Sequence, residues 1–225
     1  MNVNQRNNLV SEERPLDALL AAYAARTLSP PLTALVAAHL ELKLDNRAYV
    51  AALEAAHGVF LEELEPIPLV GRDRRLVNIF ASQDPDETEP APAQPPADDT
   101  ILPPALRRFL GYDYAKLTWR TRLPGIKEAV VAQDDVGVTS FVCSPPGRQL
   151  PLQTRDDLKV ALVLAGSFTD ANGQYERGDV AFADSEADGR PMVDGDDDCV
   201  CFIVSGGRAK PSGPLGRIWQ RVTGR

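Results

Sequence analysis

A short acidic and proline-rich segment divides this chain of 225 residues into two parts with different sequence patterns. It reads SQDPDETEPAPAQPPADDT over residues 82–100 and contains five prolines, six carboxylates and no large apolar side chain. Proline cannot donate a backbone hydrogen bond and neighbouring carboxylates repel one another, so the segment gains too little by ordering. We therefore predict a disordered linker at 82–100, between an N-terminal domain at 1–81 and a C-terminal domain at 101–225.

The N-terminal domain is predicted to be helical, because its apolar residues recur with helical spacing, first over 16–24. A second helix is expected at 30–40, capped by Ser29 and begun by two prolines. A third is expected to start after Asp45, and a short fourth to cover 73–81. Four short helices make a thin core, so this domain is expected to depend on a partner, a metal or the second domain. The third helix is expected to carry an apolar stripe of Tyr49, Leu53, Ala56, Phe60 and Leu64.

The C-terminal domain is predicted to be mostly β-structure after one short helix at 102–111. Apolar runs separated by Gly, Pro, Asn and Asp turn signals predict its strands. These runs lie at 126–132, 136–143, 159–168, 180–183 and 199–204. Many short strands at regular spacing are typical of a β-sandwich or barrel, so the whole chain is predicted to be an α+β protein.

Composition excludes several classes of protein. The chain carries 24 basic and 32 acidic residues, and most of the net charge of -8 comes from the six acids of the linker, so a basic nucleic-acid-binding face is not expected. No apolar run approaches the roughly 18 residues of a membrane span. Glu12, Glu13 and Asp17 argue against a secretory signal, and three cysteines make no disulfide framework. We expect a cytoplasmic protein that binds neither nucleic acid nor membrane directly.

One motif decides the predicted fold of the C-terminal domain. From Gly147 to Gly166 the chain reads G-x5-Q-x-R-x3-K-x6-G, which resembles the first cupin motif, G-x5-H-x-H-x3-E-x6-G. Residues at i and i+2 of a strand enter a barrel on the same side. The resemblance implies a cupin, a double-stranded β-helix or jelly-roll barrel. Gln153 and Arg155 replace both histidines and Lys159 replaces the glutamate, so we expect no metal in this barrel.

The two-domain plan resembles the ChrR family of anti-sigma factors. LDALLAAYAARTLSPPLTALVAAHL at 16–40 is similar to the opening helices of that family's anti-sigma domain. LPPALRRFLG, TWRTRLPGIKEAVV and CVCF follow in the order of the family's cupin, and the similarity covers about 14–80 and 102–207. The resemblance implies that the helical domain binds an extracytoplasmic-function sigma factor and blocks its use by RNA polymerase. The cupin would serve as a sensor or a scaffold.

The helical domain of that family usually binds zinc through H-x3-C-x2-C and an earlier histidine. In this chain the corresponding positions hold His39, Lys43 and Asn46, and the earlier position holds Arg14. One ligand of four remains, so we expect neither zinc nor any other cofactor. His39 alone is expected to be a buried or capping side chain rather than a ligand.

The residues that contact the sigma factor are expected on the fourth predicted helix. A thin helical unit has too little interior to bury a further apolar face, so that face is expected to be exposed and to cover the sigma surface that polymerase needs. The predicted contact residues are Leu76, Val77, Ile79 and Phe80.

Other functions stay open at this point. A non-enzymatic cupin could hold a small anion with Gln153, Arg155 and Lys159. A cupin enzyme is the third possibility, but the missing metal ligands argue against it, so no enzyme is expected.

The cysteines allow a second chemical interpretation. Cys199 and Cys201 lie two residues apart on a predicted strand, so both side chains face the same side. They could form a metal-binding pair or a redox pair. We favour buried small apolar side chains, and the same for Cys143.

Overall fold

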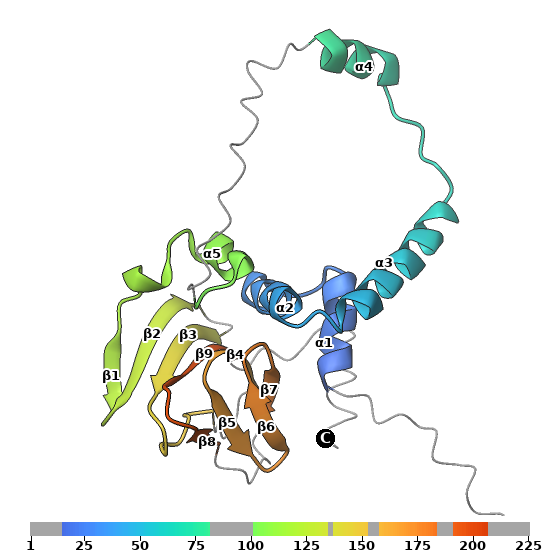
Figure 1. Ribbon diagram of the computed structural model, residues 1–225. Coiled ribbons are helices and arrows are strands. Elements are labelled where there is room, and N and C mark those ends of the chain that lie inside the picture. Colours follow the sequence, from blue (N-terminus) through green and yellow to red (C-terminus); the bar gives the residue numbers. More distant parts are fainter. Residues whose placement is uncertain (1–14, 82–100, 135–136, 153–157, 184–190, 207–225) are drawn as a thin grey trace, which may run out of the picture.

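The computed structural model describes residues 15–81, 101–134, 137–152, 158–183 and 191–206. The linker at 82–100 lies outside the described residues, so the domain boundaries stay a prediction. Helices occupy the N-terminal part and the start of the C-terminal part (Figure 1). They are α1 (Pro15–Ala24), α2 (Pro30–Leu42), α3 (Arg47–Glu62), α4 (Arg72–Ala81), α5 (Pro104–Leu110) and the short 3-10 helix η1 (Tyr114–Lys116).

Two antiparallel sheets form the C-terminal part. The larger has the strand order β1-β2-β3-β9-β4-β7, and the smaller has the order β6-β5-β8. Side chains from both sheets meet in one buried cluster, as expected of a jelly-roll barrel. The strands are β1 (Arg120–Leu123), β2 (Ile126–Gln133), β3 (Gly137–Ser144), β4 (Lys159–Ala165), β5 (Ser167–Asp170), β6 (Gly173–Glu176), β7 (Val180–Ala183), β8 (Met192–Asp194) and β9 (Cys199–Gly206).

The chain passes from the larger sheet to the smaller one at Gly166. This residue has φ +68°, and a Cβ there would lie 2.7 Å from the Asp198 carbonyl oxygen and 2.9 Å from Cys199 Cα. A side chain therefore fits neither the backbone conformation nor the space. The prediction of one continuous strand at 159–168 was wrong, because this turn ends β4 and starts β5 in the other sheet.

The larger sheet separates two hydrophobic cores. Along β4, Val160 and Leu162 belong to a core shared with the helices, whereas Ala161 and Val163 belong to the core between the two sheets. This alternation follows from the period of two in a β-strand. Phe168 of β5 closes the inner core from the opposite sheet.

The first two helices pack on the barrel rather than on one another alone. Leu20 of α1, Leu35 of α2 and Phe202 of β9 are fully buried members of the same core. The barrel therefore supplies the burial that the thin helical unit lacks. Figure 1 shows α2 and α5 side by side next to the larger sheet.

Two of the helix boundaries test the capping predictions. Ser29 is the N-cap of α2 in an extended conformation, and prolines open that helix as expected, although the serine side chain makes no capping hydrogen bond. The N-cap of α3 is Asn46 rather than Asp45, so that prediction was wrong by one residue. Asn46 uses its side chain elsewhere, in the network described below. Within the part of the chain that the structure describes, no helix combines the length and apolarity that crossing a membrane requires.

Candidate partner-binding site

The third helix leaves the body of the protein after its first two turns. Val50 is buried and Leu53 is half-buried against the shared core, and they hold the start of α3. Every residue from Glu54 to Ala81 is exposed. We call residues 54–81 the arm: it comprises the rest of α3, a connection and all of α4, and Figure 1 shows it projecting away from the barrel.

The arm carries many large apolar side chains in spite of its exposure. On α4, exposure ranges from 37% for Leu76 to 84% for Phe80. The structure thus places all four predicted contact residues on the surface and on one helix, although it does not show what binds them. The exposed apolar side chains of the arm are Val59, Phe60, Leu61, Leu64, Ile67, Leu69, Val70, Leu76, Val77, Ile79 and Phe80.

The contribution of α3 and of the connection to this surface was not predicted from the sequence. Phe60 and Leu64 were expected in an apolar stripe along the third helix, and they are 65% exposed each. Within that stripe, Leu53 packs against the core, whereas Tyr49 and Ala56 are also exposed. The run IPLV at 67–70 could have indicated a binding surface, because a connection that only faces solvent is usually polar.

Charges of both signs border the apolar surface. Arg72, Arg74 and Arg75 lie in the first turn of α4, and Glu62 and Glu63 lie where α3 ends. All five residues are exposed. A partner that covers the arm would therefore meet an apolar centre with a charged rim, which is the usual anatomy of a protein–protein interface.

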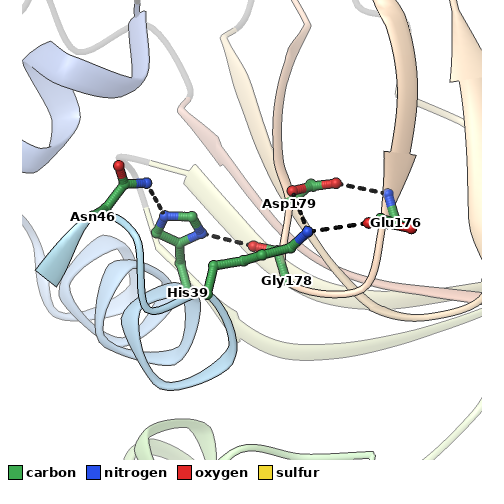
Figure 2. A network of polar contacts seen from close by, with 6 residues as sticks. His39, Asn46, Glu176, Gly178 and Asp179 are labelled. Atoms are coloured by element: carbon green, nitrogen blue, oxygen red, sulfur yellow. Dashed lines mark hydrogen bonds and ion pairs between the residues drawn. The ribbon is translucent and has the colours of Figure 1, made fainter.

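The residues at the family's zinc positions do not fit a zinc ion. His39 is 3% exposed, and its Nδ1 lies 2.7 Å from the Gly178 carbonyl oxygen, which can only accept a hydrogen bond. Nε2 is therefore the acceptor for the Asn46 side-chain amide at 2.8 Å (Figure 2). Both ring nitrogens are occupied, and Lys43 forms ion pairs with carboxylates. Arg14 lies outside the described residues.

The degenerate cupin positions are only partly described. Gln153 and Arg155 lie outside the described residues. Lys159 starts β4, shares the inner-facing register of Ala161, and donates a hydrogen bond from Nζ to the Pro151 carbonyl oxygen at 3.1 Å. The predicted anion site formed by these three side chains stays a prediction.

Cys199 and Cys201 behave as buried apolar side chains, but the same prediction was wrong for Cys143, which is half-buried and donates a hydrogen bond from Sγ to an Asp198 carboxylate oxygen at 3.6 Å. Cys199 and Cys201 are fully buried with their Sγ atoms 3.7 Å apart, so both face one side as predicted. Their contact, together with burial, raises the pKa of the Cys201 thiol well above its ordinary value. Burial and the Asp198 carboxylate raise the pKa of Cys143 to about 11. These two thiols are protonated at neutral pH, whereas metal binding and nucleophilic attack need thiolates.

We expect protein purified without an affinity tag to contain no stoichiometric zinc or iron. Among the described residues, no group of three or more His, Cys, Asp or Glu side chains is placed to hold a metal ion. Elemental analysis of the full chain by plasma mass spectrometry tests this. About one equivalent of either metal per chain would contradict the expectation.

Known proteins share both parts of this architecture. The family described as the ChrR Cupin-like domain matches residues 108–208. Anti-sigma-E factor ChrR of Cereibacter sphaeroides is 33% identical over 189 residues, which are 84% of this chain and 87% of that protein. The crystal structure of Rhodobacter sphaeroides SigE in complex with the anti-sigma ChrR aligns with a TM-score of 0.67 and 29% identity, over 85% of this chain and 96% of that chain.

Fold and sequence together define a class of protein in which a helical unit with an exposed arm is fused to a cupin barrel. Within that class, the chain belongs to the ChrR family of anti-sigma factors. The predicted α+β fold with a C-terminal cupin and the predicted family are thereby confirmed.

Proposed function

We propose that this protein is an anti-sigma factor that binds an extracytoplasmic-function sigma factor through its arm and keeps it from RNA polymerase. The observation that carries the proposal is the run of exposed residues from 54 to 81, which includes eleven large apolar side chains. A relative of known structure, the anti-sigma ChrR, was crystallised with SigE.

The arm has the physical properties of a segment that is completed by a partner. A helix of ten residues such as α4 is marginal in water on its own, because few hydrogen bonds offset the cost of nucleation. Its apolar face consists of Leu76, Ile79 and Phe80 at i, i+3 and i+4, with Val77 beside them. Seating that face in an apolar groove of a sigma factor stabilises both the helix and the complex.

Inhibition would follow from occlusion and needs no chemical step. A sigma surface covered by the arm is not available to polymerase at the same time, so the two complexes exclude each other. The fraction of sigma factor that is inhibited then depends on the amount of this protein and on its affinity for the sigma factor. No enzymatic activity is part of this function.

The cupin acts in this proposal as a scaffold that carries the helices. Support comes from the shared core, in which α1 and α2 pack on the outer face of the larger sheet. Leu20 and Leu35 are both fully buried in this core, to which Val160, Leu162 and Phe202 of the barrel also belong. The barrel is thus needed to present the arm, whether or not it also senses a signal.

The proposal is tested by mixing the full chain with each extracytoplasmic-function sigma factor encoded in the same genome. We expect one of them to form a stable complex in size-exclusion chromatography with light scattering. The same protein should reduce run-off transcription from that sigma factor's promoter, and the housekeeping sigma factor serves as the control. Failure to bind any member of the class, with the chain folded, would refute the proposal.

A further inference from the structure

The positions that would bind zinc in the helical domain form a different structure in this chain. His39 near the end of α2, Asn46 at the start of α3 and Gly178 in the turn between β6 and β7 are joined through the two nitrogens of one imidazole (Figure 2). The histidine and the glycine are 139 residues apart in the sequence. One side chain thus links both helices of the elbow between α2 and α3 to the barrel.

Lys43 adds an electrostatic contact to the same turn. Its Nζ lies 3.3 Å from a Glu176 carboxylate oxygen and 3.2 Å from an Asp179 carboxylate oxygen. The Asp179 carboxylate also accepts the Glu176 backbone N–H at 2.9 Å. Gly178 N–H donates to the Val163 carbonyl of β4 at 2.8 Å, so the turn itself is fixed to the larger sheet.

The turn and α2 approach each other so closely that a glycine is needed between them. Gly178 has φ +93°, and a Cβ there would lie 2.8 Å from Lys43 Cγ and 3.0 Å from Leu42 Cβ. Any side chain would push the end of α2 away from the barrel. The close approach is also what brings the Gly178 carbonyl within reach of the buried imidazole.

We propose that His39, Lys43 and Asn46, together with Glu176, Gly178 and Asp179, form a metal-independent latch that fixes the α2–α3 elbow to the cupin. We call this set of residues the latch. The resemblance to the ChrR family implies that zinc usually bridges the corresponding positions within the helical domain. Here hydrogen bonds and ion pairs bridge them to the barrel, so the cupin sets the direction in which α3 leaves the body. This inference concerns the free protein and holds whatever partner the arm binds.

Two substitutions in the full chain break the latch in different ways. His39→Phe keeps the side-chain volume close to that of histidine but removes both ring hydrogen bonds. The Gly178 carbonyl and the Asn46 side-chain amide then lose the hydrogen bond that each makes to the imidazole. Gly178→Ala introduces the collision with Lys43 and Leu42. Its matched control is Gly195→Ala, because Gly195 also has a positive φ of +71° but open space around its Cβ position.

The measurement is hydrogen–deuterium exchange by mass spectrometry, without any sigma factor present. We expect peptides that cover 36–53 to exchange at least about tenfold faster in both latch variants, whereas β3 and β9 change little relative to Gly195→Ala. Gly178→Ala keeps the test decisive if His39→Phe does not fold. Equal exchange at 36–53 in Gly178→Ala and Gly195→Ala would overturn the latch.

Whether the latch is independent of metal is tested by a separate measurement. Exchange at 36–53 in the parent protein should be the same with EDTA and with one added equivalent of zinc. Faster exchange in EDTA, or zinc binding that His39→Phe abolishes, would show that the site is a metal site after all. Because neither assay contains a sigma factor, the latch can fail while the proposed function stands, and the reverse also holds.

Discussion

Phe80→Asp should weaken the complex with the sigma factor at least about 100-fold while leaving the protein as stable as before. Phe80 is 84% exposed in the free chain and lies on the apolar face of α4. Truncating an interface hot spot costs about 2 kcal/mol or more, and an unpaired carboxylate in an apolar contact costs more than truncation does. The measurement is isothermal titration calorimetry with the full chain and the sigma factor identified by the complex assay.

The matched control for this substitution is Asn78→Asp. It adds the same charge to the same helix, but position 78 lies opposite Leu76, Ile79 and Phe80 by helical geometry. We expect its affinity to stay within about threefold of the parent, as for a substitution outside the contact. If both variants lose affinity equally, the effect is one of net charge. If Phe80→Asp binds as the parent does, α4 is not the contact.

Phe202→Ala should be the most destabilising single substitution that we expect in the shared core, at about 3–5 kcal/mol. Phe202 is fully buried on β9, with ring centroids 4.9 Å from Phe141 and 6.2 Å from Phe109. Its removal leaves a cavity and loses two aromatic contacts, one within the sheet to Phe141 of β3 and one between the sheet and α5 to Phe109. Urea unfolding followed by circular dichroism at 222 nm and by tryptophan fluorescence measures the change.

The control is the same truncation on the arm. Phe60→Ala removes an equally large side chain that is 65% exposed, and it should change the free energy of unfolding by less than about 0.5 kcal/mol. The two probes should also report one midpoint for Phe202→Ala, because helices and sheet share a core. If the circular dichroism signal of the helices kept the parent's urea midpoint in Phe202→Ala, the helices would be shown to unfold independently of the barrel.

Local sequence signals were sufficient where the structure depends on neighbours in the chain. Prolines after Ser29 start α2, as predicted, and the short helix predicted at 102–111 ends at Gly111, which adopts a left-handed conformation. The strand at 180–183 has the predicted bounds. These features follow from backbone preferences that tertiary contacts do not override here.

Contacts between residues far apart in the chain could not be predicted from the sequence. Periodicity placed Phe60 and Leu64 on one face of a helix. The same apolar pattern occurs on a face that packs on the core and on a face that binds a partner, so it does not distinguish the two. The loss of three of the four zinc positions was readable from the sequence, yet the carbonyl that binds His39 belongs to a glycine 139 residues further along the chain. A backbone acceptor has no residue type, so no sequence motif marks it.

The short attachment of α3 gives the protein a mechanical property. Helix α3 is held by Val50 and Leu53 and ends at Glu62, so its free part is about 13.5 Å long at 1.5 Å per residue. A rotation of only about 10° at its base would move the tip of the helix by about 2.3 Å, close to half the 5.4 Å pitch of an α-helix. The base of α3 packs against α1 in the shared core, so small changes of angle there become larger changes of position along the arm, where a partner would bind.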